Sequence, residues 1–334
     1  MPEGPEVTVI REGLNSLLQG RQIFDLEILT PSRFSKKAPI GYRDFIASLP
    51  TRIESVNSKG KFIYFKFTNG WVMFNTLGMS GGWYHKQKAH SALKLFYSSR
   101  KNKINKPQSV STPEQITEYL SKKKMNSVKN NKILFFVDQR RFGNVKFVQT
   151  QQELDKKLNT LGPDILNDSS LTFDIYKSRM RKYDKKYLVW AMMEQKIISG
   201  IGNYLKSEIL YQSRISPHVL VHDLPDDKLR ELYNISKQKI NDSYKARGAS
   251  VRHYSDIEDR KGVFEFQFQV YNQKTDQKGN KVIREKTKDK RTTHWVPSVQ
   301  TDDFINTDKT NDTDNINDID DSNSNNIDSD NVKK

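Results

Sequence analysis

Met1-Pro2-Glu3-Gly4-Pro5-Glu6-Val7 opens the chain, and the residues that follow show a helical pattern. Apolar residues recur at helical spacing from Val7 to Leu18, and Gly20 ends the pattern, so we predict a helix over this range. The opening stretch carries two prolines and two carboxylates and lacks a long apolar segment. We therefore do not expect it to be a secretory signal.

Pro2 and Glu3 give this stretch a candidate chemical role. Removal of the initiator Met would leave Pro2 with a secondary α-amine. Because an α-amino group has a pKa of about 7.7–8.0, a useful fraction is unprotonated at neutral pH and can attack an electrophilic sugar carbon. Glu3 beside it suits general acid–base catalysis. The alternative is that the stretch only caps the helix, with Pro5 and Glu6 in its first turn.

Composition limits the class of protein. A chain of 334 residues has room for two domains. No apolar run approaches the roughly 20 residues that span a bilayer, so we expect no membrane segment. The chain has no Cys, and its six His residues show no paired spacing with carboxylates, so we expect no disulfide, metal site or cofactor. This composition fits an intracellular protein.

Charge is distributed unevenly along the chain. Residues 301–334 contain ten Asp and three Lys, whereas the preceding 300 residues carry 53 Lys and Arg against 30 Asp and Glu. Such a basic region is typical of a protein that binds a polyanion, most simply nucleic acid. A merely solubilising surface charge is the alternative.

Short alternating or β-branched stretches dominate the first 150 residues, which favours a β-sandwich or barrel. A short helix is expected at Gly41–Leu49. Residues 100–131 are rich in Lys, Asn and Ser around a weak helical patch at Glu114–Leu120, and we interpret them as an exposed insertion. The expected strands are Ile23–Leu29, Arg52–Val56, Phe62–Phe67, Trp71–Phe74, Ala92–Tyr97, Ile133–Val137 and Val145–Val148.

Three turns between these strands carry candidate contacts with nucleic acid. Lys61 follows Gly60 in a tight basic turn that could reach a phosphate or could simply protect a sheet edge. Met79 lies in a glycine-rich turn, where it is either presented to a ligand or buried in the core. Arg140 and Phe142 lie on a turn that ends at Gly143; they could enter a duplex as a wedge, unless Phe142 is buried at a strand end.

From residue 151 the pattern becomes helical, so we place a domain boundary near residue 150. Between two apolar helices lies Gly200-Ile201-Gly202-Asn203, whose glycines allow the backbone to approach a partner closely. The N–H groups that open the next helix could bind an anion, with Asn203 as an additional donor. An ordinary helix–turn–helix connection would also use Gly here. The expected helices are Glu153–Leu161, Phe173–Arg181, Tyr187–Glu194, Tyr204–Gln212 and Asp226–Ala246.

The last ordered part is expected to be a cationic β-hairpin over Phe264–Val299, with its turn at Lys278-Gly279-Asn280. Beyond Thr301 the chain is rich in Asn, Asp and Ser and has few bulky apolar residues. It cannot bury enough surface to fold, so we expect an acidic disordered tail.

Five motifs, in this order, resemble the formamidopyrimidine-DNA glycosylase/endonuclease VIII family of base-excision repair enzymes. Each motif alone is a weak signal, but together they are specific. They are Pro2-Glu3-Gly4-Pro5-Glu6-Val7, Leu77-Gly78-Met79-Ser80-Gly81, Asp138-Gln139-Arg140-Arg141-Phe142-Gly143, Leu161-Gly162-Pro163-Asp164, and Gly200-Ile201-Gly202-Asn203 with Glu208-Ile209-Leu210.

The resemblance implies an α+β fold that grips DNA between two domains. With the composition shift, it predicts an N-terminal β-sandwich catalytic domain at residues 1–150 and a helix-two-turns-helix domain at residues 151–262. A C-terminal zincless β-hairpin finger follows at residues 263–300, with the tail at residues 301–334. Many relatives hold this finger with zinc on four cysteines, but here Trp295-Val296-Pro297 and Ser298-Val299-Gln300 lie where cysteines would be interspersed.

The resemblance also implies roles for single residues. Pro2 resembles the nucleophile that attacks sugar C1′, Glu3 the acid–base that opens the sugar ring, and Lys61 a phosphate contact beside them. Glu6 and Glu208 resemble supporting carboxylates. Asn203 and Gly202 match the phosphate clamp, and Arg291 a finger contact with the DNA backbone. Met79, Arg140 and Phe142 look like the side chains that fill the void left by an extruded base.

These roles imply a bifunctional DNA glycosylase and abasic-site lyase without a cofactor, working as a monomer on damaged duplex or single-stranded DNA. The start motif looks more like the endonuclease VIII branch, whereas residues 248–254 lie where the other branch carries a lesion-covering loop. We therefore expect broad specificity, for oxidised pyrimidines, formamidopyrimidines and hydantoins. The rival classes are a catalytically inactive damaged-DNA binder and an RNA-binding protein.

Overall fold

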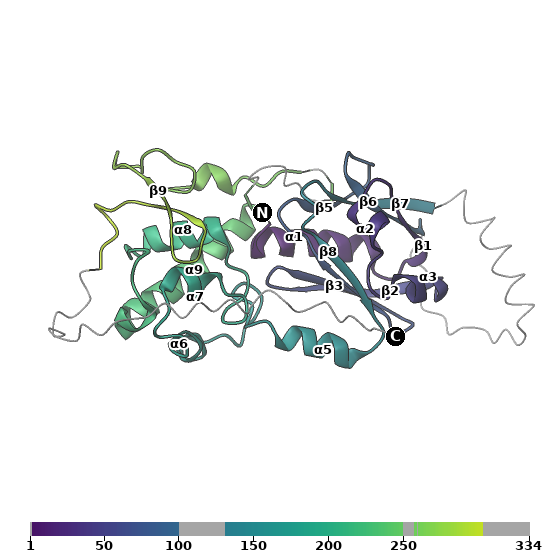
Figure 1. The fold of residues 1–334 in the computed structure, drawn as a ribbon, viewed down its shortest axis with the longest axis horizontal. Coiled ribbons are helices and arrows are strands. Elements are labelled where there is room, and N and C mark those ends of the chain that lie inside the picture. Colours follow the sequence, from purple (N-terminus) through teal and green to yellow (C-terminus); the bar gives the residue numbers. More distant parts are fainter. Residues whose placement is uncertain (1, 100–130, 250–256, 259, 303–334) are drawn as a thin grey trace, which may run out of the picture.

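The computed structural model describes residues 2–99, 131–249, 257–258 and 260–302. Nearly all of the expected insertion, including the patch at Glu114–Leu120, the tail beyond residue 302 and most of the 248–254 segment lie outside this range. The eight-stranded sheet occupies one part of the molecule and most of the helices the other, and the start of the chain lies between them (Figure 1).

The first part contains α1 (Gly4–Leu18), β1 (Gln22–Ile28), α2 (Arg33–Lys36), α3 (Tyr42–Ala47), β2 (Thr51–Lys59), β3 (Phe62–Phe67), β4 (Val72–Thr76), β5 (Gly81–Tyr84), β6 (Ser91–Ser98), β7 (Asn131–Asp138) and β8 (Asn144–Val148). The rest contains α5 (Gln151–Asn159), α6 (Phe173–Arg181), α7 (Leu188–Met193), α8 (Asn203–Gln212), the 3-10 turn η2 (Val221–Asp223), α9 (Asp226–Lys245), the 3-10 turn η3 (Phe264–Gln267), β9 (Ile283–Lys286) and β10 (Thr292–Trp295).

The eight strands of the first part form two antiparallel halves, β5-β7-β6-β1 and β2-β3-β4-β8. The halves are joined by a short β1–β2 pairing at Gln22 and Ile23. Side chains of both halves share one apolar core, in which Trp83 lies 5.7 Å from Phe65 and 5.3 Å from Phe136 between ring centroids. This arrangement agrees with the expected sandwich, and all seven expected strands form. β5 is an additional strand that the sequence pattern did not indicate.

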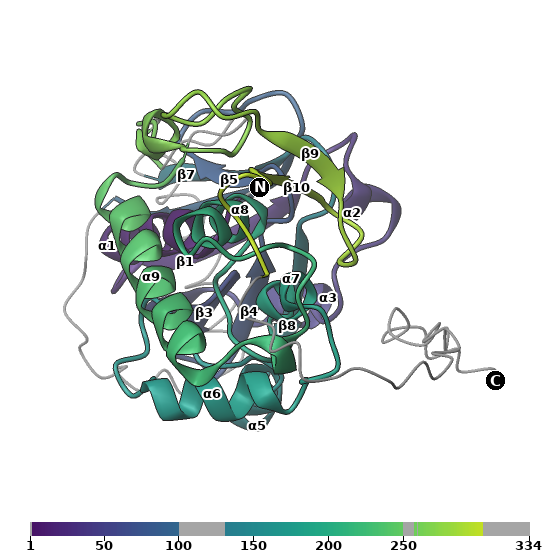
Figure 2. The same cartoon turned by 90° about the vertical axis from the view of Figure 1, so that its left-hand side faces the viewer.

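α1 packs into this core through Val7, Ile10, Leu14 and Leu18, which are buried. The helix contacts β2 on one side and α9 on the other. It therefore belongs to both parts of the molecule, and Figure 2 shows it beside α8 and α9. The burial of its apolar stripe anchors the helix that begins just after Glu3.

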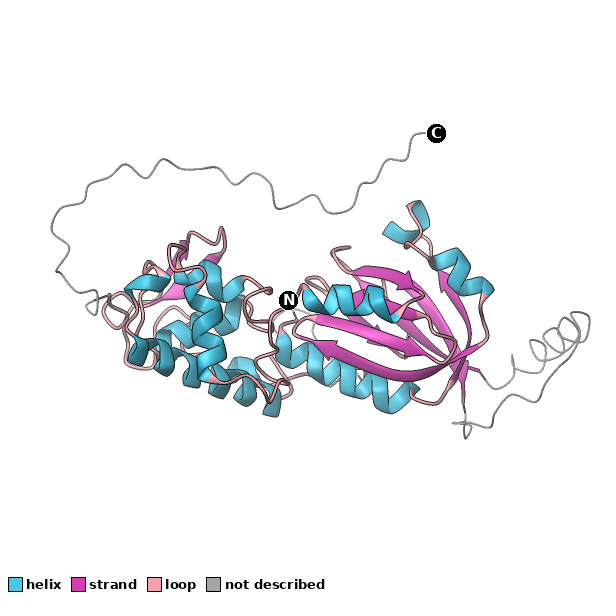
Figure 3. Cartoon of the chain, turned by 90° about the horizontal axis from the view of Figure 1, so that it is seen from below, coloured by secondary structure: helices cyan, strands magenta, loops and turns pink. Residues whose placement is uncertain are grey.

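The helical part has a second core, built from residues of α6, α7, α8 and α9. α5 does not join it: Leu154 packs with Phe62, Phe74 and Val148 on the sheet, and Figure 3 shows helices lying along the strands. The expected boundary at residue 150 therefore separates α5 from the sheet on which it packs. Among the described residues, no helix is both long and apolar enough to span a membrane.

The C-terminal hairpin forms, but its two strands are joined at residues 287–291 rather than at the predicted turn. β9 and β10 pair across residues 287–291, with Lys286 opposite Thr292. Lys278-Gly279-Asn280 makes a separate turn that precedes both strands and is closed by the amide of Gly279 on the carbonyl of Asp276. The turn was therefore predicted correctly as a turn, and an isolated antiparallel bridge between Thr275 and Lys281 flanks it.

Candidate active site

Glu3 is fixed at the junction of the two parts of the molecule. It caps α1, and its backbone N–H donates to Glu6 Oε2 at 2.7 Å. Its carboxylate accepts the N–H of Tyr204 at 3.0 Å and that of Leu205 at 3.4 Å, both in the first turn of α8. Pro2 is buried immediately before it. The start of α1 thus meets the start of α8.

Gly202 is required for this contact. A Cβ atom at residue 202 would lie 2.2 Å from the carboxyl carbon of Glu3. The expected anion site at the start of α8 is therefore already occupied in part by the carboxylate of Glu3, because two of the helix's first N–H groups donate to it. The Tyr204 and Leu205 amides bind Glu3, so the anion site predicted at this helix start remains a prediction for Gly202 and Asn203.

Glu6 is the centre of a buried network. Oε1 accepts the Tyr204 hydroxyl at 2.8 Å and the Ala249 N–H at 2.7 Å, and that hydroxyl also lies 2.8 Å from Ser243 Oγ. Burial raises the pKa of Glu6 above its ordinary value. The network connects α1 with α8 and α9, so Glu6 holds the start of the chain in place.

Lys61 faces Glu3 from the β2–β3 turn. Gly60 adopts φ of 56°, and its N–H donates to buried Asp164 at 2.8 Å, which ties this turn to the helical part. Burial lowers the pKa of Lys61 to about 8, although the nearby Glu3 charge opposes this shift. Burial raises the pKa of Glu3 to about 7, with Lys61 acting against the increase. Both groups can therefore exchange protons near neutral pH.

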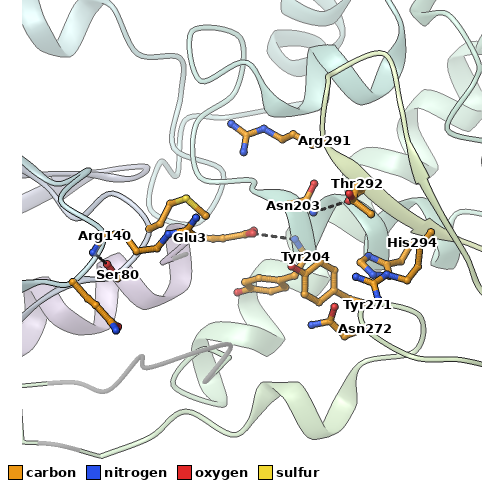
Figure 4. Close-up of a pocket in the computed structure, with 13 residues that line it drawn as sticks. Glu3, Ser80, Arg140, Asn203, Tyr204, Tyr271, Asn272, Arg291, Thr292 and His294 are labelled. Carbon is orange, nitrogen blue, oxygen red and sulfur yellow. Dashed lines mark hydrogen bonds between the residues drawn. The ribbon is translucent and has the colours of Figure 1, made fainter.

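A cavity of about 710 Å³ opens over this junction. Figure 4 shows Glu3 between Arg140 on the sheet side and Asn203 on the helical side. The cavity is lined by Glu3, Met79, Ser80, Gln139, Arg140, Asn203, Tyr204, Tyr271, Asn272, Arg284, Arg291, Thr292 and His294. Three arginines and one buried carboxylate in one cavity suit an anionic ligand that must exchange a proton.

α8 holds the hairpin beside the cavity. Asn203 Nδ2 donates to the Thr292 carbonyl at 2.8 Å, and Lys206 Nζ pairs with Asp289 Oδ2 at 2.5 Å with both side chains buried. Glu208 accepts three backbone N–H groups, of Gln269, Val270 and Tyr271, at 2.8–3.0 Å. Arg291 lies in the turn that these contacts fix, and its side chain is exposed.

The three expected void-filling side chains come together on the sheet side. Met79 and Arg140 line the cavity, and the guanidinium of Arg140 lies 5.7 Å from the centre of the Phe142 ring. Phe142 is 59% exposed, so the alternative of a buried strand end was wrong. A large apolar side chain held in solvent beside a cavity is a candidate for contact with a ligand.

Comparison with known proteins agrees with this geometry. Three family models match the chain: the N-terminal domain of formamidopyrimidine-DNA glycosylase over residues 1–145, its H2TH domain over residues 161–255 and its C-terminal domain over residues 256–301. The chain belongs to the formamidopyrimidine-DNA glycosylase family. The resemblance seen in the sequence is confirmed.

Among relatives of this family, the formamidopyrimidine-DNA glycosylase of Ligilactobacillus salivarius is 25% identical over 90% of this chain and 99% of its own length. That of Oceanobacillus iheyensis is 27% identical over 82% of this chain and 87% of its own. The crystal structure of the MutM (Fpg) protein from Thermus thermophilus superposes with a TM-score of 0.70 at 22% identity, covering 90% of this chain and 98% of that one. A Lactococcus lactis Fpg mutant in complex with Fapy-dG-containing DNA gives 0.71 at 21% identity, covering 90% and 99%.

The finger of this family member does not fit zinc. The chain has no Cys, and within the described residues no group of three His, Asp or Glu side chains could hold a metal. In place of metal ligands, Val270, Val282 and Val296 form a small buried cluster with Val299 and Tyr211. The Tyr211 hydroxyl donates to Asp276 at 2.9 Å, and Asp276 accepts the amides of Lys278 and Asn280. Apolar packing and the carboxylates of Asp276, Glu208 and Asp289 hold the finger instead.

Several cavity residues were not identified as site residues from the sequence. Ser80 and Gln139 lie inside motifs that were recognised, and Tyr204 directly follows one, but no role was assigned to them. Tyr271, Asn272, Arg284, Thr292 and His294 come from the finger, whose placement over the cavity depends on α8. His294 is 2% exposed, and neither of its ring nitrogens has a hydrogen-bond partner among the residues that the structure describes. In the sequence, only the position of Arg291 in the finger pattern indicated that the finger contributes to the site.

Proposed function

We propose that the protein is a bifunctional DNA glycosylase of base-excision repair that excises oxidised bases through Pro2 and then nicks the abasic strand. The observation that carries this proposal is the position of Glu3. A buried carboxyl with its pKa raised to about 7 follows the candidate amine directly and opens onto a cationic cavity. Family membership supports glycosylase chemistry, and the cavity supports a DNA ligand.

The covalent step follows from these two residues. After removal of Met1, the unprotonated Pro2 amine attacks C1′ of the damaged nucleotide, and the base leaves with the electrons of the glycosidic bond. The Pro2 nitrogen then loses its proton, and the departing base takes one up. Glu3 donates a proton to the ring oxygen as the sugar opens, which leaves an iminium between Pro2 and C1′. The iminium makes the C2′ proton acidic, so its removal expels the 3′ phosphate. A second elimination expels the 5′ phosphate, and hydrolysis then frees the amine.

The same cavity provides the grip on DNA. Arg291 from the finger lines the cavity, and Lys61 from the β2–β3 turn lies close enough to Glu3 to oppose the rise of its pKa. We propose that both cations contact phosphates together with Asn203 and Gly202. Met79, Arg140 and Phe142 occupy the gap left by the extruded nucleotide, which offsets the few kcal/mol that extrusion costs. Several related structures contain damaged DNA. We expect the enzyme to act as a monomer.

Base release and strand cleavage on a panel of oligonucleotides test this function. The panel carries a formamidopyrimidine, thymine glycol, 5-hydroxyuracil, a hydantoin and 8-oxoguanine, each in duplex and single strands. We expect release of oxidised pyrimidines, formamidopyrimidines and hydantoins with cleavage at both phosphates, and none of this with Glu3→Gln. Tight binding without release on any substrate would indicate an inactive binder. Preference for undamaged RNA in competition would indicate an RNA-binding protein.

A further inference from the structure

Two loops that carry the void-filling side chains meet at a single hydroxyl group. Ser80, beside Met79, accepts the backbone N–H of Arg140 at 2.8 Å and donates to Asp138 Oδ1 at 3.0 Å. Figure 4 shows the contact between Ser80 and Arg140 at the edge of the cavity. The loop after β4 and the loop after β7 are thereby joined through Ser80.

Asp138 closes the second loop from within. The residue is 4% exposed, and its other carboxylate oxygen accepts the N–H of Gly143 at 2.6 Å. The loop between them turns back on itself and leaves Phe142 59% exposed. Hydrogen bonds to a charged acceptor are stronger than neutral ones, and a buried carboxylate that loses a donor is costly.

The backbones of the two loops also touch. Gly78 adopts φ of 59°, and a Cβ atom there would lie 2.6 Å from the Phe142 carbonyl carbon and from Gly143 N. From the far side, Arg33 Nη1 donates to the carbonyls of Arg141 at 3.1 Å and Gly143 at 2.9 Å. The loops therefore have little room to move independently of one another.

We propose that Ser80 and Asp138 are positioning residues that lock the Met79 loop and the Arg140–Phe142 loop into one rigid wedge, and that this lock favours lesions in duplex over single-stranded DNA. The inference rests on the proposed function, because it assumes that these side chains fill the void. In a duplex, three side chains must enter one gap together, and a wedge ordered in advance avoids that ordering cost on binding. In a single strand, no opposite base needs support.

The test compares one lesion in duplex and in single-stranded DNA for Ser80→Ala, Asp138→Asn and the double variant. We expect kcat/KM on the duplex to fall about 10- to 100-fold, as for the loss of one or two charge-assisted hydrogen bonds, and to change less than about 3-fold on the single strand. The double variant should lose less than the product of the single losses, because both changes break the same contact. Ser170→Ala and Asp168→Asn are the matched controls, because they break a similar Ser–Asp hydrogen bond of 2.6 Å in another turn. Both should leave the ratio of kcat/KM on the duplex to kcat/KM on the single strand unchanged.

An equal loss of kcat/KM on duplex and single-stranded DNA, or no loss on either, would contradict the proposed role of Ser80 and Asp138. Filling of the void is measured separately, by the fluorescence of 2-aminopurine placed opposite a non-cleavable abasic analogue in bound duplex. We expect a weaker fluorescence change with both variants. If the unmodified protein binds this duplex but cleaves no lesion, the proposed function fails. The fluorescence change with and without the substitutions then still tests whether Ser80 and Asp138 hold the two loops together. If Asp138→Asn does not fold, Ser80→Ala alone provides the comparison.

Discussion

The carboxylate of Glu3 accepts the backbone N–H of Tyr204 at 3.0 Å, across 201 positions of sequence. This one contact places the candidate acid–base at the positive end of α8 and joins the sheet domain to the helical domain. A helix N-terminus favours a negative charge, whereas burial opposes one. Burial is the larger effect, because the pKa of Glu3 is raised to about 7.

Glu3→Gln should therefore make the fold less sensitive to alkaline pH. The folded-state pKa of about 7 lies above the ordinary 4.5, so the contribution of Glu3 to stability is full below about pH 4.5 and is lost as pH rises through 7. Gln keeps an oxygen for the Tyr204 N–H. We expect the difference in unfolding free energy between the variant and the original protein to shift by about 1–3 kcal/mol in favour of the variant when the pH is raised from 5 to 8.5. Thermal unfolding of both proteins at the two pH values measures this shift, and Glu54→Gln, at an exposed position, is the control. A stability difference between Glu3→Gln and the original protein that is the same at both pH values would refute the prediction.

Tyr204→Phe should destabilise the protein by removing a hydrogen bond that fixes the start of α1. Its hydroxyl bonds to Glu6 and lies against Ser243 in a fully buried network. Removing it leaves polar groups without a partner, so we expect a loss of about 1–3 kcal/mol in the free energy of unfolding. Chemical denaturation provides the value. Tyr244→Phe is the matched control, because that hydroxyl donates to the more exposed Glu12 and should cost less. Equal losses of unfolding free energy in Tyr204→Phe and Tyr244→Phe would show that burial does not increase the contribution of this hydrogen bond to stability.

Lys206→Met should cost more than replacement of both members of its ion pair. Lys206 and Asp289 are 0% and 2% exposed, so the single change leaves a buried carboxylate unpaired. We expect a loss of about 3–5 kcal/mol for the single variant and a clearly smaller one for Lys206→Met with Asp289→Leu. Lys228→Met breaks an exposed pair with Glu231 and should cost less than about 1 kcal/mol. A double variant no more stable than Lys206→Met would contradict this reasoning.

Arg291→Ala should weaken DNA binding in a salt-dependent way. Its guanidinium is exposed at the edge of the cavity, where we place a phosphate. The slope of log affinity against log salt should fall by about one unit, equally for different sequences. Titrations at several salt concentrations measure the slope. Lys278→Ala, in the earlier turn of the finger, removes a positive charge outside the cavity; if it changes the slope as much as Arg291→Ala does, the specific contact does not exist.

Local patterns predicted most of the fold. The helix after Val7, the strand Phe62–Phe67 and the helix Phe173–Arg181 follow directly from apolar periodicity, and the motif order indicated the family. The hairpin turn was misplaced because Lys278-Gly279-Asn280 has the composition of a hairpin turn while Asp276 stabilises it as a separate one. Long-range relationships were not predictable. Neither the Glu3–Tyr204 contact nor the Lys206–Asp289 pair has any local signal, since each depends on how two distant elements pack.

Borohydride trapping on duplex DNA with an abasic site or a cleaved lesion tests the central claim most directly. The protein with Met1 removed is compared with a form that retains Met1 and with Pro2→Gly. We predict a covalent adduct that peptide mapping assigns to Pro2, and a loss of that adduct when Met1 blocks the amine. An adduct on Lys61, or one that forms equally well with Met1 in place, would contradict the claim that the Pro2 amine is the nucleophile.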